Sequence, residues 1–425
     1  MKTVVIVAPH FFPSFLPAVH RARLWAYHLP EFGWRPIIVT TDPRYYECQI
    51  DEELNQLVPS DVPVIRTRAL PTRPIRIIGN LGFRSMWWYY RAIRDLAARQ
   101  KIDFVHITCD SFPASLIGPR IQRKLGIPYG IDYQDPWIRE TPDRSTPFTK
   151  PWLARRLSKL LEPRAVRDAR LITGINEHYF ASMLARNPGV RERAVTAGMP
   201  FGSSPRDFEF LERNGRKPFL FDPSDGKLHL IYAGALLPQS HGVLERLFEA
   251  LKIVLRDPRF ADRLRVHFVG TGMREGDPTR GHTVTPYIEK WSLGGVVDEH
   301  PSRVSYLDVL NHLRLADGVL VIGSTEPHYS PSKIYQAALS RRPVLALLHR
   351  DSTAAPLLET SRAGSVVRFT AESLPAAAEL AATLEAFLSK QYRPEEVDWS
   401  VFDRDSARES TRAFAAAMDE ALRRS

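Results

Sequence analysis

The stretch that decides the fold of this chain reads KTVVIVA at residues 2–8 and PIIVT at residues 36–40. Both runs are short, apolar and rich in β-branched side chains, which is typical of strands buried on both faces of a parallel sheet. Between them, residues 19–32 repeat apolar side chains at helical spacing, and Gly33 follows as a C-terminal cap. This strand–helix–strand unit predicts an α/β fold with a doubly wound sheet.

The alternation of strands and helices occurs twice along the chain, which predicts two Rossmann-like doubly wound domains facing a central cleft. Further strands are predicted at residues 103–108, 127–132, 170–173, 228–233, 265–269, 318–322 and 343–347. A stretch rich in Gly, Ser, Pro and charge separates the halves. The expected parts are an N-terminal domain over 1–195, a linker over 196–226, a C-terminal domain over 227–400 and a last helix over 401–425, which packs back towards the first domain.

Composition narrows the class of protein. The chain has 425 residues and a net charge of +10, from 58 basic and 48 acidic side chains. Its only cysteines are Cys48 and Cys109, so a disulfide scaffold is excluded and no metal site is expected. No apolar run approaches the ~18 residues that span a bilayer. The apolar run in the first residues is too short for the apolar region of a signal peptide. We therefore expect a cytoplasmic protein, with any membrane contact peripheral and at the inner face.

Several common catalytic motifs are missing from the sequence. No GxGxxG follows the first strand, and neither GxxxxGK[ST], GxSxG nor HExxH occurs. These absences argue against NAD binding, a P-loop nucleotidase, a serine hydrolase and a zinc protease. We expect no prosthetic group.

The most informative stretch is GSTEPHYSPSKIYQAALSRRPVLAL at residues 323–347. It reads as strand, loop, helix, turn and strand, with Ser330 as helix cap and Pro331 in the first turn. The free N–H groups from Ser332 onwards, beside Lys333, would form a seat for a diphosphate. The alternative is an ordinary capped helix with an exposed lysine.

Four segments in the same order resemble the glycosyltransferases of family 4. They are FPSFLPAVHRARLWAYHLPEFGWRPIIVTTDP, DFVHITCDSFPASLIG, GIPYGIDYQDPW and SPSKIYQAALSRRPVLAL. The resemblance implies the GT-B fold and a nucleoside-diphosphate sugar donor of the UDP or GDP type, held mainly by the C-terminal domain. It implies transfer with retention to a hydroxyl on a glycan, lipid-linked or small-molecule acceptor, without a metal ion and without a carboxylate nucleophile.

The resemblance also assigns site residues. His328 and Gln336 stand where the family usually has two glutamates. Asp132, Asp135 and His328 are assigned to the reacting centre, although Asp135 before Pro136 also fits a simple turn. The donor-binding set is Gly234, Gly270, Thr271, Gly272, Arg303, Ser330, Pro331, Ser332, Lys333 and Gln336. The acceptor-side set is Pro13, Ser14, Thr108 and Asp110.

Residues 66–101 carry nine basic side chains and one acidic one, Asp95, around the aromatic run at 86–90. This mixture suits a membrane interface or nucleic acid, and no RNA-binding motif accompanies it. We therefore expect a peripheral membrane contact and no nucleic acid, the alternative being that the aromatic run packs into the core.

Two other functions stay open. Residues 234–242 lack the Arg and Lys that usually clamp the diphosphate in this family. The chain could therefore be a non-catalytic nucleotide-sugar or glycan-binding partner of another transferase. A weaker alternative is a nucleotide-sugar epimerase.

Overall fold

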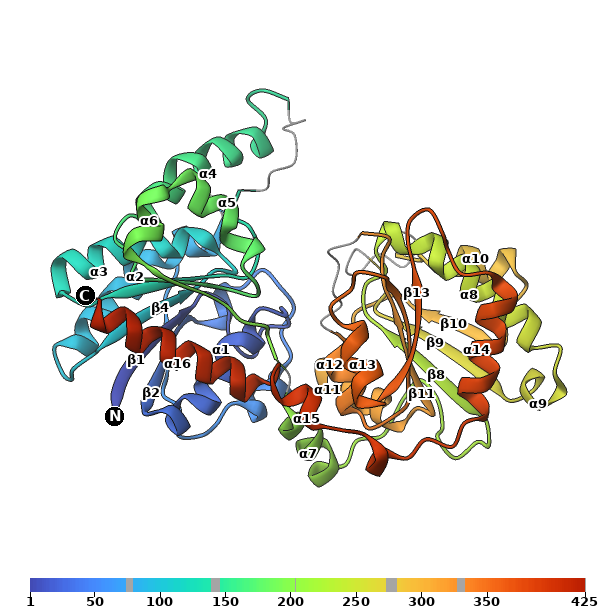
Figure 1. Cartoon of the computed structure of the whole chain (residues 1–425). Helices are drawn as coiled ribbons and strands as arrows, with labels where there is room; N and C mark the ends of the chain where they lie inside the picture. The colour runs from blue at the N-terminus through green and yellow to red at the C-terminus, as the bar shows by residue number, and fades with distance from the viewer. Residues whose placement is uncertain (74–78, 139–145, 203, 273–280, 327–332, 425) are drawn as a thin grey trace. The chain divides into compact units, whose positions relative to one another are not determined.

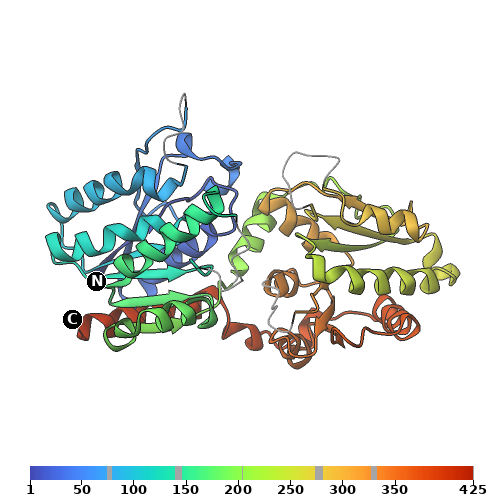
Figure 2. The same cartoon turned by 90° about the horizontal axis from the view of Figure 1, so that it is seen from above.

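The computed structural model describes residues 1–73, 79–138, 146–202, 204–272, 281–326 and 333–424. The chain forms two compact units, and each is a parallel sheet with its covering helices (Figure 1). The first unit is Met1–Gly202 together with Asp405–Ser425, and the second is Ser203–Arg404. Both chain ends thus belong to the first unit, where they lie near one another (Figure 2).

The first unit contains a seven-stranded sheet in the order β3-β2-β1-β4-β5-β6-β7. Its strands are β1 (Lys2–Ala8), β2 (Trp34–Thr41), β3 (Val64–Thr67), β4 (Phe104–Thr108), β5 (Tyr129–Tyr133), β6 (Leu171–Gly174) and β7 (Val195–Gly198). Its helices are α1 (Val19–His28), α2 (Leu81–Ala97), α3 (Gly118–Leu125), α4 (Lys150–Val166), α5 (His178–Arg186), α6 (Pro188–Arg193) and α16 (Ala407–Arg423). The order of strands reverses direction between β1 and β4, so this is the switch point of the sheet.

Strand β1 lies at the centre of this sheet, as its sequence predicts. Ile6 is paired with Ile38 of β2 on one side and with His106 of β4 on the other. Residues 3–8 are buried because helices cover both faces of the sheet. The predicted strand at residues 2–8 is confirmed residue for residue.

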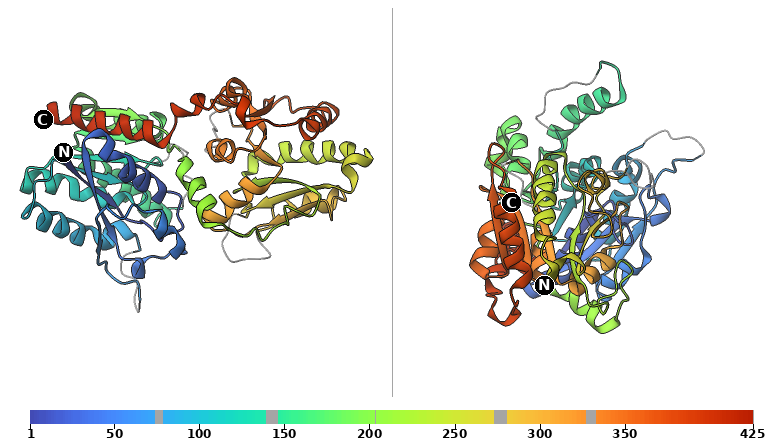
Figure 3. Two further views of the ribbon diagram at one scale, coloured as in Figure 1. Left: turned by 90° about the horizontal axis from the view of Figure 1, so that it is seen from below. Right: turned by 90° about the vertical axis from the view of Figure 1, so that its right-hand side faces the viewer.

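The last helix, α16, packs on the first unit beside α1 (Figure 3). Phe414 of α16 is fully buried and stacks on Trp25 of α1, with ring centroids 4.2 Å apart. The Ser410 hydroxyl donates to the carbonyl of Pro200 at 2.8 Å, and Arg408 pairs with Glu31 at 2.7 Å. The end of the chain therefore completes the core of the unit in which the chain begins.

The second unit contains a six-stranded sheet in the order β10-β9-β8-β11-β12-β13. Its strands are β8 (Leu228–Ala233), β9 (Leu264–Val269), β10 (Val297–His300), β11 (Gly318–Ile322), β12 (Val344–His349) and β13 (Gly364–Phe369). Its helices are α7 (Pro205–Asn214), α8 (His241–Val254), α9 (Pro258–Ala261), α10 (Thr285–Lys290), α11 (Tyr306–Leu315), α12 (Lys333–Leu339), α13 (Ala355–Ser361), α14 (Ala377–Ser389) and α15 (Ser400–Asp403). One sheet face forms a continuous apolar core with α8 and α14.

The stretch predicted as a linker, 196–226, is more ordered than its composition suggests. It holds most of β7 and all of α7, and the second unit begins at Ser203. Helix α7 has a proline, Pro205, at its first position, and its buried Asp207 accepts a hydrogen bond from the hydroxyl of Tyr306 at 2.8 Å. Tertiary contacts therefore order a segment that is poor in apolar side chains.

No helix in the described part of the chain is both long and apolar enough to cross a lipid bilayer.

Replacing Phe414 by Ala should lower the free energy of unfolding by about 3–5 kcal/mol, because it leaves a cavity against Trp25. The matched control is Phe148→Ala, since Phe148 is exposed in the same unit. Chemical denaturation measures both. Equal effects of the two substitutions would show that α16 adds no core to the first unit.

Candidate functional site

In the second unit, the loops after β8 and β9 meet at the edge where the parallel strands end. The amide of Gly234 donates to the carbonyl of Val269 at 2.6 Å, and that of Gly270 donates to His300 at 2.8 Å. Gly234 has a φ of 126° and Gly270 one of 68°, and side-chain-bearing residues rarely adopt these values. Both glycines are therefore required by the backbone path at this edge.

Lys333 of α12 fills the space that Gly234 leaves. A Cβ atom on Gly234 would lie 2.0 Å from the Lys333 ammonium nitrogen. That nitrogen lies 5.0 Å from the ring centroid of Tyr232 and donates weakly to the carbonyl of Ala235 at 3.4 Å. The absence of a side chain at residue 234 thus positions the lysine at the carboxyl edge.

Burial lowers the pKa of Lys333 to about 8, and no carboxylate of the described residues offsets this. At pH 7 the lysine is still mostly charged, because its pKa remains above the pH. A partly desolvated cation without a carboxylate partner is a candidate ligand-binding group, since an incoming anion would relieve its desolvation. Lys333 is therefore a candidate for binding an anion at the edge of the second sheet.

Glu299 of β10 holds the neighbouring loop. Its carboxylate accepts hydrogen bonds from the amides of Thr283, Val284 and Thr285 at 3.0, 3.1 and 2.7 Å, and from the hydroxyl of Thr271. Although burial alone would raise the pKa of Glu299, the hydrogen bonds from Thr271 and Thr285 outweigh it and keep this pKa below its usual value. Glu299 is therefore a fixed anion with a structural task. The sequence does not reveal this role, because the hydrogen-bond partners of Glu299 are distant from it in the chain and come close only in the folded structure.

The predicted donor-binding residues fall into three groups. Gly234, Gly270, Thr271, Gly272 and Lys333 come together at this edge. Gln336 lies three residues after Lys333 and thus on the same face of α12, whereas Arg303 is exposed in the segment after β10. His328, Ser330, Pro331 and Ser332 lie outside the described residues.

In the first unit, His10 and Asp110 form a pair at the switch point between β1 and β4. The His10 Nδ1 and Asp110 Oδ2 atoms lie 2.5 Å apart, and the His10 amide donates to the same oxygen at 3.2 Å. The two side chains are almost buried, and each follows the end of its strand. Asp110 was predicted on the acceptor side, whereas His10 was not singled out because nothing in the sequence pairs it with a residue 100 positions away.

A pocket of about 340 Å³ opens beside this pair. Its lining residues are Leu16, Pro17, Ala18, Cys109, Asp110, Phe112, Gln134, Asp135 and Phe201. Gln134 is only 7% exposed, and neither atom of its side-chain amide has a hydrogen-bond partner among the described residues. The Oδ1 atom of Asp110 is also unpartnered. Buried polar atoms without partners are rare in proteins, so these three atoms mark a place for a polar ligand.

The predicted residues of the first unit separate into those that line the pocket and those beneath it. Asp110 and Asp135 line it, and Asp135 is exposed. Pro13, Ser14 and Thr108 are buried and are not among its lining residues. The Thr108 hydroxyl donates to the carbonyl of Val7 at 3.2 Å, and the Ser14 hydroxyl lies 3.3 Å from the Cys48 sulfur.

Asp132, predicted at the reacting centre, lies wholly inside the first unit. Its carboxylate accepts two hydrogen bonds from the Arg21 guanidinium, at 2.8 and 2.9 Å, and one from the Thr173 hydroxyl at 2.6 Å. Arg21 also donates to the carbonyls of Met199 and Pro200. This buried pair fixes α1 against the end of β5 and against the segment after β7.

Thr173 connects this pair to His106. Because the Thr173 hydroxyl gives its proton to Asp132, the His106 Nε2 atom, 3.1 Å away, must be the donor to Thr173. Burial lowers the pKa of His106 to about 3, so its ring is neutral at pH 7. His106 is thus a core histidine that supports the network beneath the pocket.

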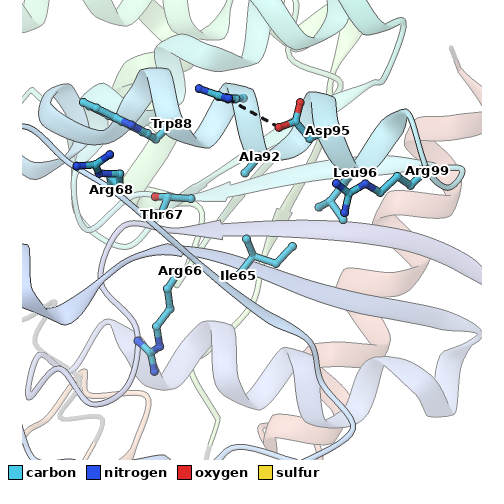
Figure 4. Close-up of a pocket in the computed structure, with 10 residues that line it drawn as sticks. Ile65, Arg66, Thr67, Arg68, Trp88, Ala92, Asp95, Leu96 and Arg99 are labelled. Carbon is cyan, nitrogen blue, oxygen red and sulfur yellow. Dashed lines mark ion pairs between the residues drawn. The ribbon is translucent and has the colours of Figure 1, made fainter.

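A second hollow, of about 330 Å³, lies between α2 and the edge strand β3 (Figure 4). Its lining residues are Ile65, Arg66, Thr67, Arg68, Trp88, Arg91, Ala92, Asp95, Leu96 and Arg99. Arg91 pairs with Asp95 at 3.8 Å, whereas Arg66 extends to the other side of β3 in Figure 4. Of the nine basic side chains in 66–101, four belong to residues that line this hollow.

The aromatic run at 86–90 divides between core and surface. Tyr89 and Tyr90 are buried, Met86 and Trp88 are half-buried, and Trp87 is exposed. The alternative that the run packs into the core is therefore confirmed for Tyr89 and Tyr90, and the membrane contact stays a prediction.

Among the described residues, no group of three or more His, Cys, Asp or Glu side chains is arranged to hold a metal ion.

Most of the first unit matches one known protein family. Residues 18–198 match the family model described as a glycosyl transferase 4-like domain. No curated protein matches the sequence significantly.

Solved structures resemble the whole chain at low identity. The N-terminal domain of Candida albicans trehalose-6-phosphate phosphatase has a TM-score of 0.60 at 14% identity, covering 99% of this chain and 97% of that chain. The α,α-trehalose 6-phosphate synthase of Burkholderia multivorans has a TM-score of 0.60 at 12% identity, covering 99% and 96%. Anabaena HepE in complex with UDP has a TM-score of 0.57 at 15% identity, covering 99% and 100%. These likenesses establish the fold, which is the two-domain GT-B fold.

Gly234→Ala should force the Lys333 side chain to move and should impose a strained φ, at a cost of about 1–3 kcal/mol of unfolding free energy. Gly294→Ala is the matched control, because its Cβ would meet open space and its φ is ordinary. Thermal unfolding measures both variants. A Gly234→Ala protein as stable as Gly294→Ala would contradict the close contact with Lys333.

Proposed function

We propose that this chain, whose residues 18–198 match the glycosyl transferase 4-like domain, is a glycosyltransferase of family 4 that transfers a sugar from a nucleoside-diphosphate donor to an acceptor hydroxyl. The transfer proceeds with retention at the anomeric carbon and without a metal ion. The observation that carries the proposal is Lys333, a cation at the carboxyl edge of the second sheet that no carboxylate of the described residues neutralises.

Lys333 is suited to the leaving group of this reaction. As the bond from the sugar to the diphosphate breaks, negative charge grows on the diphosphate, and a fixed ammonium stabilises that charge. Gln336, on the same helix face, would donate to a ribose hydroxyl. Anabaena HepE, whose fold this chain shares, is described in complexes with UDP and with UDP-glucose. UDP is therefore the first nucleotide to test, and GDP the second.

The acceptor belongs in the pocket of the first unit. The Gln134 amide can both donate and accept, and Asp110 Oδ1 accepts, which matches the hydroxyls of a sugar. Phe112 and Phe201 supply apolar surface for the face of a sugar ring. A glycan or a lipid-linked sugar would present such a ring, and residues 66–101 would add positive charge for an anionic carrier.

The two aspartates near the pocket have different roles in this proposal. In the retaining reaction the donor phosphate takes the proton of the acceptor hydroxyl, so the protein need not supply a base. Asp135, exposed on the pocket wall, orients that hydroxyl. Asp132 is a positioning residue, because it holds Arg21 and Thr173 beneath the pocket.

A non-catalytic nucleotide-sugar-binding role is the second candidate. It is favoured by residues 234–242, which follow β8 and include no Arg or Lys. Binding of UDP or UDP-glucose without sugar transfer and without donor hydrolysis would establish this role instead.

UDP affinity should fall as the pH rises through the pKa of Lys333. Only the charged lysine binds the diphosphate, and its charged fraction drops from about 90% at pH 7 to about 10% at pH 9, given a pKa of about 8. The dissociation constant at pH 9 should thus be about tenfold higher than at pH 7, as measured by calorimetric titration. The control is Lys333→Arg, which stays charged over this range. The same weakening in that variant would rule out Lys333 as the titrating group.

Gln134→Leu should raise the KM for the acceptor about tenfold, because each hydrogen bond lost from the buried amide costs about 0.5–1.5 kcal/mol. The assay follows UDP released from UDP-glucose with the best of a panel of free hexoses. Gln122→Leu is the matched control, since Gln122 on α3 also has an unpartnered buried oxygen but does not line the pocket. An unchanged acceptor KM, or a rise in the donor KM alone, would remove the acceptor from this pocket.

A further inference from the structure

Helix α4 projects from the first unit and leaves its N-terminal part uncovered (Figures 1 and 3). None of the residues 146–161 is buried, whereas the last turns of the helix bury Glu162, Ala165 and Val166. About three turns of helix therefore stand clear of the core of their own unit.

The uncovered part carries a stripe of leucines. Leu153, Leu157 and Leu160 lie at positions i, i+4 and i+7, so they share one face of the helix. They are 52%, 43% and 54% exposed, and Phe148, just before the helix, is 82% exposed. Because contiguous exposed apolar surface is uncommon on soluble proteins, a stripe of this kind marks an interaction site.

The opposite side of the helix is anchored. The buried carboxylate of Glu162 accepts hydrogen bonds from Arg186 of α5 at 2.9 and 3.0 Å. Glu162 lies about 180° around the helix from Leu153, given 100° per residue. The ion pair therefore fixes the rotation of α4, and the leucine stripe faces away from the unit.

Positive charge accompanies the stripe. Residues 146–161 contain Lys150, Arg155, Arg156 and Lys159, and they contain no Asp or Glu. Lys150 and Arg156 lie about 60° to either side of Leu153 on the helical wheel. Apolar side chains flanked by basic ones on a single helix are typical of helices that lie in the interface of an anionic bilayer.

We propose that residues 148–160 dock this protein on the surface of an anionic lipid bilayer. Leu153, Leu157 and Leu160 enter the acyl boundary together with Phe148, while the flanking basic side chains contact lipid phosphates. Charge complementarity selects this occupant, since Lys150 and Arg156 flank the stripe and residues 146–161 contain no acidic side chain, so two copies would repel one another in a dimer formed through the same face. The inference does not depend on sugar transfer, because no residue of α4 belongs to the candidate site.

The surface differs from the membrane contact that the sequence predicts over 66–101. There Tyr89 and Tyr90 are buried, and the apolar side chains beside the arginines, such as Trp88 and Leu96, line a hollow rather than form an exposed stripe. Segment 66–101 can add charge, but the structure places the apolar surface on α4.

The test is co-sedimentation of the full chain with vesicles of phosphatidylcholine containing about one third phosphatidylglycerol, and with vesicles of phosphatidylcholine alone. The wild type should bind the anionic vesicles and should lose most of this binding at high salt. The variant Leu153→Gln, Leu157→Gln, Leu160→Gln should bind at least tenfold more weakly. The variant Lys150→Gln, Arg156→Gln, Lys159→Gln should also bind the anionic vesicles more weakly than the wild type does. Its binding to vesicles of phosphatidylcholine alone should equal that of the wild type.

Matched controls separate α4 from other exposed positions. Ile50→Gln with Leu70→Gln changes comparably exposed apolar side chains elsewhere in the unit, and it should leave vesicle binding unchanged. Arg91→Gln, Arg94→Gln, Arg99→Gln tests segment 66–101 and should have the smaller effect. UDP affinity should be unchanged in all variants, so failure here is distinct from failure of the proposed function.

A wild-type protein that does not co-sediment with anionic vesicles would overturn the proposal. So would a leucine variant that binds as the wild type does, or a larger loss from the α2 arginines. Sedimentation equilibrium tests the other possibility, which is that a second copy of the chain binds to the stripe. A wild-type protein that is a dimer, together with a leucine variant that is a monomer, would establish that dimer and overturn the proposal.

Discussion

Within each of the two sheets every strand runs parallel to its neighbours, and the placement of the candidate site residues depends on that constraint. Parallel strands end at one edge, so loops distant in sequence meet there. In the second unit this brings Gly234 and Gly270 together beneath Lys333, and in the first it pairs His10 with Asp110 across the switch point. Continuous burial of the strands leaves these edges as the places where polar side chains can face a ligand. The site residues thus follow from the topology.

The two units differ in whether a buried charge has a partner of opposite charge among the described residues. In the first, Arg21 and Asp132 neutralise one another with bidentate geometry, and additional hydrogen bonds satisfy the rest of both groups. Breaking such a pair leaves an uncompensated buried charge, so we interpret it as a fixed support for the pocket. In the second unit, burial removes water from around the Lys333 ammonium group and lowers its pKa to about 8. No carboxylate of the described residues compensates for this loss of solvation. In the proposed function, an incoming diphosphate supplies the missing partner.

Much of the fold could be predicted from local pattern. The strands at 2–8, 228–233 and 318–322 are confirmed exactly, because uninterrupted apolar runs between turn signals specify buried strands. Helix α7 was missed because its sequence, PRDFEFLERN, is poor in apolar side chains and was assigned to a linker. At the site, Lys333 could be found from the helix that it begins. Gln134 and His10 could not, because an unpartnered amide and a pair 100 residues apart exist only in three dimensions.

The central claim is that the carboxyl edge of the second sheet, around Lys333, is the seat of a nucleoside diphosphate. The most direct measurement is the thermal stability of the full chain with and without UDP, in the wild type and in Lys333→Ala. A ligand present at 100 times its dissociation constant stabilises a protein by about 2.7 kcal/mol. The account predicts a clear shift for the wild type and a much smaller one for the variant at the same UDP concentration. Equal shifts in the two proteins would contradict it.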